Sequence, residues 1–189
     1  MFLAVSTATM SPMFLLGTVG GWLGSRWAGA VVLGSVVLGG WLAGLLAGGF
    51  TREDAPPRTD AKKPPVQPLS FGEAVEQAAK TMLLVCGTMV MLRVLAALVT
   101  AACSYGALPL TTLLEVTTGA VEIAGLPLPL PLRTAIIAGA TGFGGTASVM
   151  QNRALYPSGL MSLPEQLLWQ AAHGGISFLL ALGVMLLTA

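Results

Sequence analysis

WAGAVVLGSVVLGGWLAGLLAGGF, residues 27–50, contains no charged side chain. About 20 apolar residues, rising about 1.5 Å each, cross a hydrocarbon core that is about 30 Å thick. This stretch is therefore long enough to span a bilayer as one helix. Small residues recur along it and allow a second helix to approach closely; they are Gly29, Gly34, Gly39, Gly40 and Gly44.

The composition of the whole chain agrees with a membrane location. Hydrophobic residues make up 54% of the 189 residues and charged residues 9%, and the mean hydropathy is +0.81. Soluble domains usually carry about 25% charged residues, so a soluble globular protein is excluded. The net charge of +1 leaves no basic face for phosphates, which excludes a nucleic-acid partner. The sequence predicts an all-α, multi-pass protein whose partner is the lipid bilayer of the cell membrane.

Charges divide the chain into three parts. Residues 1–50 carry only Arg26, and Ser11-Pro12 interrupts their first apolar stretch, so we expect a re-entrant segment followed by a transmembrane helix. Residues 51–69 are polar and rich in proline, which indicates an extramembrane loop. Its basic residues place it on the cytoplasmic side by the positive-inside rule; they are Arg52, Arg58, Lys62 and Lys63.

Residues 70–189 are expected to hold two further full spans. SFGEAVEQAAK, residues 70–80, begins with a capping-box pattern of Ser70 and Glu73 and predicts an interfacial helix that enters a span at residues 81–104. Both cysteines, Cys86 and Cys103, lie in this apolar stretch and are expected to be small core residues. After a short loop at residues 156–164, residues 165–189 form the last span.

Three segments combine helix breakers with Ser or Thr, which predicts interrupted helices. They are TATMSP at residues 7–12, EVTTG at residues 115–119 and GFGGTAS at residues 142–148. The second is expected to break at TTG, residues 117–119. Between the last two, Pro127, Pro129 and Pro131 alternate with Leu and indicate a stiff extended connector before a helix that starts at Arg133.

Non-helical backbone survives in a membrane only where it is buried in protein or lines a cavity, because an unsatisfied N–H or C=O in lipid costs several kcal/mol. In secondary transporters, such breaks present half-helix N-termini to anionic groups and carbonyl groups to cations. The N–H groups of Thr146, Ala147 and Ser148 are therefore expected to face an anion. The alternative stays open that each glycine only packs helices together.

Ionisable residues within the apolar segments have more than one interpretation. Glu115 is expected to be a coupling-ion or proton position, because a carboxylate in a membrane must be paired, protonated or hydrated. Arg93 is its partner in one interpretation; in the others it snorkels or faces a water-filled vestibule. His173 is expected to be a hydrogen-bonded packing residue rather than a proton carrier. The chain has no triad, P-loop or metal-ligand spacing, so we expect no enzyme activity, cofactor or metal.

Several motifs, in order along almost the whole chain, resemble the YlbJ family of sporulation integral membrane proteins, which carry nucleoside-recognition or gate domains. They are SPMF (11–14), GTVGGWLG (17–24), SFGEAVEQAAK (70–80), LLEVTTG (113–119), GFGGTASVMQ (142–151) and His173-Gly174. The resemblance implies a transporter-like protein of endospore formers that is linked to movement of dipicolinate, a small planar dianion. The gate-domain name implies nucleosides as the alternative substrate class.

The resemblance covers only the C-terminal half of the family's pattern, with residues 70–189 as the gate-like domain. It therefore implies half of an inverted-repeat transporter, which places its site between two halves. A separate chain, a second copy of this chain or a longer form of it is expected to supply the other half.

The function expected from the sequence is that of a permease subunit that moves a small organic anion during endospore formation by alternating access around the broken helices. The alternative is a non-transporting scaffold in a sporulation complex. The residues expected to bind the solute are Ser11, Thr117, Thr118, Gly119, Gly142, Gly144, Gly145, Thr146, Ser148 and Gln151.

Overall fold

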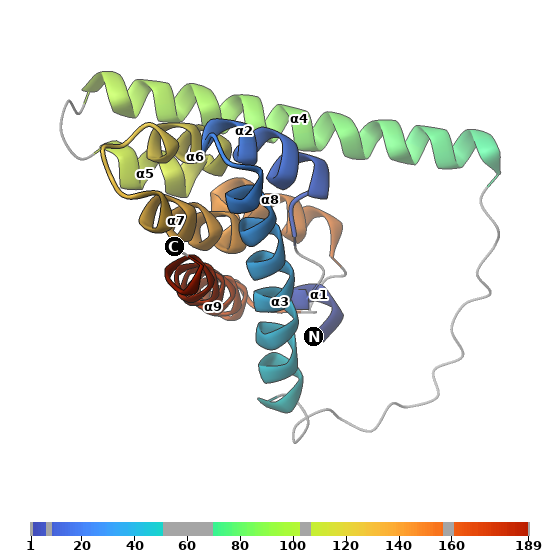
Figure 1. Ribbon diagram of the computed structural model, residues 1–189. Helices are drawn as coiled ribbons and strands as arrows, with labels where there is room; N and C mark the ends of the chain where they lie inside the picture. Colours follow the sequence, from blue (N-terminus) through green and yellow to red (C-terminus); the bar gives the residue numbers. More distant parts are fainter. Residues whose placement is uncertain (1, 7–8, 51–69, 103–106, 157–160, 189) are drawn as a thin grey trace.

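The computed structural model describes residues 2–6, 9–50, 70–102, 107–156 and 161–188, and every regular element in these ranges is a helix (Figure 1). In chain order the elements are α1 (Phe2–Ser6), the π-helix η1 (Phe14–Val19), α2 (Gly20–Trp22), α3 (Arg26–Phe50), α4 (Phe71–Ala102), α5 (Ala107–Leu114), α6 (Val116–Ala124), α7 (Leu130–Phe143), α8 (Gly145–Leu155) and α9 (Leu163–Leu187). The predicted all-α class is confirmed. The loop predicted at residues 51–69 and the core position predicted for Cys103 lie outside the described residues.

Three helices, α3, α4 and α9, are long and apolar enough to cross a membrane, as predicted. The last one begins two residues earlier than expected, because Ser162 caps it. Ser162 Oγ accepts a hydrogen bond from the Glu165 N–H at 3.4 Å, and Glu165 Oε2 accepts one from the Ser162 N–H at 2.7 Å. Pro164, predicted to lie in the preceding loop, is in the first turn of α9. Backbone N–H groups in a first turn form no hydrogen bond within the helix, so proline is tolerated there.

The centre of the fold is a bundle of α3, α7 and α9 (Figure 1). Glycines let α7 and α9 approach closely. A Cβ at Gly174 would lie 2.7 Å from the Gly139 carbonyl oxygen, and one at Gly142 would lie 2.7 Å from Ser177 Oγ. Gly142 is inside α7 and packs against α9, so the prediction that it belongs to a helix break is wrong.

Replacing Gly174 by alanine is expected to lower the free energy of unfolding by about 1–3 kcal/mol, because the added methyl group would push α7 and α9 apart. The next residue supplies a matched control, since a Cβ at Gly175 would have no heavy atom within 4 Å. Gly175→Ala is expected to stabilise the protein by up to roughly 1 kcal/mol through helix propensity. Unfolding of both variants in detergent measures the difference, and equal effects would contradict the close packing.

The N-terminal segment packs against α3. Residues 9–11 are not helical, and the chain becomes helical again at Pro12, so the break predicted in this region is found in its described part. Ser11 Oγ accepts a hydrogen bond from the Phe14 N–H at 3.2 Å and thereby caps the new helix. The Tyr156 hydroxyl, just after α8, donates to the Ala4 carbonyl at 2.9 Å. The helical segments on either side of the break, α1 and η1, therefore both pack against α3, and α1 is also tied to the end of α8.

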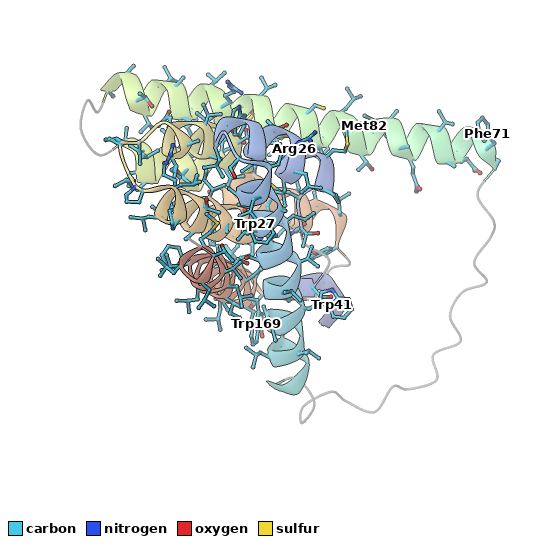
Figure 2. The ribbon with its side chains drawn as sticks, viewed as in Figure 1. Arg26, Trp27, Trp41, Phe71, Met82 and Trp169 are labelled. Atoms are coloured by element: carbon cyan, nitrogen blue, oxygen red, sulfur yellow. The ribbon has the colours of Figure 1, made fainter. Side chains whose placement is uncertain are left out.

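Helix α4 lies along one edge of the bundle, and its first turns, which begin at Phe71, extend beyond the other helices (Figures 1 and 2). The predicted capping box is present, since the Ser70 N–H donates to Glu73 Oε2 at 2.8 Å and the Glu73 N–H to Ser70 Oγ at 3.3 Å. The helix runs without interruption to Ala102, so the expected interfacial helix and the span are one element.

Most of α4 is exposed, because it packs mainly against α5 and α8. Only 11% of its most apolar window is buried, compared with 50% for α3. Cys86 is exposed on this helix, so the prediction that it is a core residue is wrong. The apolar sequence of α4 reflects contact with a nonpolar surrounding rather than burial within the chain.

Candidate functional site

The three interrupted segments meet around one cavity of about 670 Å³. Its walls come from the segment before η1, from α4, from the α5–α6 and α7–α8 junctions and from α8. Cavities of about 300–1,000 Å³ are the size that holds small organic ligands. The lining residues are Thr9, Met10, Ser11, Phe14, Val85, Met89, Glu115, Val116, Thr117, Thr141, Gly144, Ala147, Ser148, Gln151, Asn152 and Tyr156.

Glu115 forms the break between α5 and α6 and is the N-cap of α6. Its carboxylate accepts hydrogen bonds from the N–H groups of Thr117 and Thr118, at 2.9 and 2.8 Å. The hydroxyls of the same two threonines donate to Oε2, at 2.5 and 2.7 Å. Four donors directed at one carboxyl group, together with the positive end of the α6 dipole, favour its ionised form. Glu115 is 2% exposed and lines the cavity, so a negative charge is fixed in its wall.

The position of this break corrects the sequence prediction. Thr117, Thr118 and Gly119 are helical, so the chain does not break at TTG. The break is at Glu115, two residues before Thr117, because the Glu115 carboxylate satisfies free N–H groups in the first turn of α6. Gly119 packs against α5, where a Cβ would lie 2.6 Å from Thr112 Cα.

Arg93 does not pair with Glu115. It is exposed on α4, and the only ion pair among the described residues joins Lys80 and Glu76 on the same helix. The predicted interpretation in which Arg93 neutralises Glu115 is therefore wrong. Hydrogen bonds from Thr117 and Thr118 stabilise the Glu115 carboxylate instead. The two alternatives for Arg93, snorkelling and a water-filled vestibule, remain predictions.

Gly144 and Gly145 form the break between α7 and α8. Both have positive φ angles, +82° and +72°, in the left-handed region that L-residues with a side chain rarely adopt. Gly144 is both the last cap of α7 and the first cap of α8, and no side chain caps the N–H groups that begin α8. The second glycine does not line the cavity; a Cβ on it would lie 3.1 Å from the Leu113 carbonyl oxygen of α5. The predicted interruption is therefore found at its two central glycines.

The first turns of α8 carry polar residues into the cavity. Ser148 and Gln151, one helical turn apart, both line it, as does Ala147. Thr146 does not, because its hydroxyl donates to the Leu113 carbonyl at 2.9 Å. The side chain of Gln170, on α9, donates to Ser148 Oγ at 3.0 Å and ties α8 to the bundle.

The structure thus divides the residues predicted from the sequence into two groups. Those that line the cavity are Ser11, Glu115, Thr117, Gly144, Ser148 and Gln151. Those that shape the surrounding helices without lining it are Thr118, Gly119, Gly142, Gly145 and Thr146. The three predicted helix breaks therefore indicate where the cavity lies. The prediction that every residue of a break lines the cavity is wrong.

Sequence reasoning missed several lining residues. Asn152 directly follows the predicted Gln151 and adds a second amide, and Tyr156 and Phe14 supply aromatic rings. The α4 residues Val85 and Met89 add an apolar wall. The contiguous polar run from Gln151 could have indicated Asn152. Nothing in the sequence indicates which face of the mostly apolar residues 81–102 of α4 meets the cavity.

The lining combines polar side chains with a larger apolar surface and is nearly uncharged. Among the described lining residues, Glu115 is the only carboxylic acid and there is no Lys, Arg or His. Among the described residues, no three His, Cys, Asp or Glu side chains lie close enough to hold a metal ion. The cavity therefore suits a solute that forms hydrogen bonds and places an aromatic or apolar part against Phe14, Met89 and Tyr156.

Comparisons with protein-family models, curated proteins and solved structures find no match to this chain. The similarity to the YlbJ family therefore stays a prediction. What supports a function is the geometry of the cavity and the membrane-spanning length of α3, α4 and α9.

Proposed function

We propose that this chain is a subunit of a membrane permease that binds a small polar solute where its three helix breaks meet. The observation that carries the proposal is the cavity of about 670 Å³, which residues far apart in the sequence line together. In a membrane, broken helices around a polar cavity are typical of secondary transporters. Alternating access around the breaks is the mechanism that this arrangement supports, and the endospore setting comes from the family resemblance alone.

The charge of the lining favours an uncharged solute over a dianion. A helix N-terminus is equivalent to about half a positive charge, and the N-terminus of α6 already faces the Glu115 carboxylate. Two other helix N-termini lie in the described part of the wall: the helix after Ser11, where Ser11 Oγ caps the Phe14 N–H, and the start of α8. No basic side chain of the described lining accompanies either of them. A dipicolinate-like dianion would thus bring two negative charges near an ionised carboxylate. Of the two substrate classes implied by the family resemblance, the nucleoside-type class fits this lining better.

Glu115 is the residue to which we assign the coupling-ion or proton position. It carries the one formal charge among the lining residues that the structure describes. Its Oε1 accepts a single hydrogen bond, whereas Oε2 accepts three. Because a carboxylate oxygen has two lone pairs, Oε1 retains capacity for a proton or a cation. Entry of a cation there would neutralise the wall when the solute binds.

The proposal includes a second half of the transporter. α4 borders the cavity through Val85 and Met89. The rest of its surface over residues 81–102 is largely exposed and apolar, and Arg93 is the one charged residue in that range. Two copies packed in parallel through this face would place two arginines at the same depth, where they repel. A separate membrane chain with a carboxylate at that depth therefore fits better than a parallel homodimer.

Uptake into proteoliposomes tests the proposal, with uridine and dipicolinate as the two probes. Gln151→Ala is expected to weaken uridine binding about tenfold, because one hydrogen bond worth about 1.4 kcal/mol is lost. Gln77→Ala, which changes an exposed glutamine of α4 outside the cavity, is the matched control and is expected to have no effect.

Saturable uptake of dipicolinate alone would overturn the choice of an uncharged solute. If neither probe binds, with or without a co-expressed partner half, a non-transporting scaffold would be the better description. Purified protein that is active as a single copy per vesicle would contradict the requirement for a second half.

A further inference from the structure

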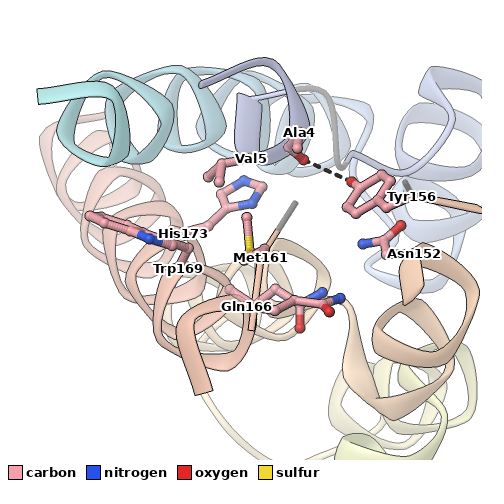
Figure 3. A pocket seen from close by; sticks show the side chains of 9 residues that line it. Ala4, Val5, Asn152, Tyr156, Met161, Gln166, Trp169 and His173 are labelled. Atoms are coloured by element: carbon pink, nitrogen blue, oxygen red, sulfur yellow. Dashed lines mark hydrogen bonds between the residues drawn. The ribbon is translucent and has the colours of Figure 1, made fainter. Parts of the chain in front are cut away.

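A second, much smaller cavity of about 20 Å³ lies among α1, α8 and α9 (Figure 3). A cavity needs about 10–15 Å³ of such space to hold one water molecule, so this one accommodates a single water. It shares Asn152 and Tyr156 with the large cavity, so the two are neighbours. Its lining residues are Ala4, Val5, Asn152, Tyr156, Met161, Gln166, Trp169, Gln170 and His173.

Gln170 has an unsatisfied polar atom in this wall. Its side-chain Oε1 is buried and has no hydrogen-bond partner among the described residues, and the residue is 7% exposed. Its Nε2 donates to Ser148 Oγ. If the amide were turned over, Ser148 would donate to the oxygen and the NH2 group would lack a partner instead. Either orientation leaves one end of the buried amide without a hydrogen-bond partner, which is unfavourable unless something binds there.

His173 lines the same cavity and is 1% exposed. Its Nε2 lies 2.8 Å from the Val36 carbonyl oxygen of α3. A carbonyl oxygen only accepts, so Nε2 carries a hydrogen and donates it. In the neutral ring, Nδ1 is then an acceptor. Gln170 and His173 both line a space that has room for one water molecule, so a single water can lie within reach of both side chains.

We propose that the small cavity is a binding site for one ordered water that donates to Gln170 Oε1 and to His173 Nδ1. A buried water typically forms two to four hydrogen bonds, which these groups and the nearby amides supply. The water completes a hydrogen-bonded chain that runs from Val36 through His173, the water and Gln170 to Ser148, in the wall of the large cavity. His173 is thereby linked to the large cavity without touching it, and this link does not depend on which solute the large cavity takes.

Nuclear magnetic resonance of the protein labelled with 15N-histidine in detergent tests the proposal directly, because His173 is the single histidine of the chain. The expected spectrum has one ring with the hydrogen on Nε2 and a cross-peak between this ring and a long-lived water. Two variants are expected to abolish the water cross-peak: Gln170→Met, which removes the polar partner, and Val5→Leu, which fills the cavity.

The second variant keeps the test valid if Gln170→Met fails to fold. Gln77→Met, on the exposed face of α4, is the control and is expected to retain the cross-peak. The absence of a long-lived water at His173 in the unaltered protein, or a ring with its hydrogen on Nδ1, would overturn the proposal. A cross-peak that persists in both Gln170→Met and Val5→Leu would overturn it as well.

Discussion

Gly145→Leu is expected to lower the free energy of unfolding by about 2–5 kcal/mol and to abolish solute uptake. A residue with a side chain in the left-handed region costs about 1–2 kcal/mol, and an overpacked position costs about 1–3 kcal/mol more. Both apply here, since φ is +72° and a Cβ would lie 3.1 Å from the Leu113 carbonyl oxygen. Relief of the strain would move α8 away from α5 and displace Ser148 and Gln151 in the cavity wall.

The control for this change is Gly183→Leu. Gly183 is an exposed position of α9 at which a Cβ would have no heavy atom within 4 Å, and its φ is not in the left-handed region. Chemical unfolding in mixed micelles and uptake in proteoliposomes measure both variants. A Gly145→Leu protein as stable and active as Gly183→Leu would show that the α7–α8 break is not needed.

Glu115→Gln is expected to lower the free energy of unfolding by roughly 2–5 kcal/mol, the sum of a lost N-cap and a lost charge-assisted hydrogen bond. Glutamine has nearly the same shape, but its NH2 group would face N–H and O–H donors of Thr117 and Thr118 where the carboxylate now accepts. If Glu115 is the coupling position, uptake in this variant no longer responds to an imposed proton or sodium gradient.

Glu122→Gln supplies the comparison on the same helix. Glu122 is exposed and lies in the last turn of α6, where a negative charge opposes the helix dipole, so its removal is expected to leave stability unchanged or slightly raised. Thermal unfolding and gradient-driven uptake separate the two effects. A stable Glu115→Gln protein whose uptake still follows the gradient would remove Glu115 from the coupling mechanism.

The parts of the fold that could be predicted from the sequence are those set by local physics. The uncharged run of residues 27–50 and the capping box at Ser70 each define a helix without tertiary information, and both are found. The breaks were also predictable, because paired glycines and an acidic residue ahead of two threonines are poor helix interiors. Their convergence on one cavity was an expectation that only a three-dimensional arrangement could test.

The errors arose where tertiary contacts or caps outweigh composition. Pro131 was assigned to the extended connector, but it lies in the first turn of α7, where proline loses no hydrogen bond, so this helix begins at Leu130 rather than at Arg133. Gly142 was assigned to a break, but a neighbouring helix needs the space of its missing side chain. The interpretation that pairs Arg93 with Glu115, one of three for Arg93, rests on charge alone, whereas two threonine side chains donate hydrogen bonds to that carboxylate locally.

The weak attachment of α4 has a consequence for how a solute reaches the cavity. One wall is made by Val85 and Met89 of this helix, which touches the rest of the fold mainly through α5 and α8. A sideways displacement of α4 would open the cavity on that side. The hydrogen bonds inside α4 would stay intact, because the backbone N–H and C=O groups of an α-helix bond to one another within the helix. Where lipid rather than a partner chain borders α4, such a displacement would open the cavity toward the acyl chains. Amphiphilic solutes that partition into lipid would then have a path into the cavity from within the bilayer.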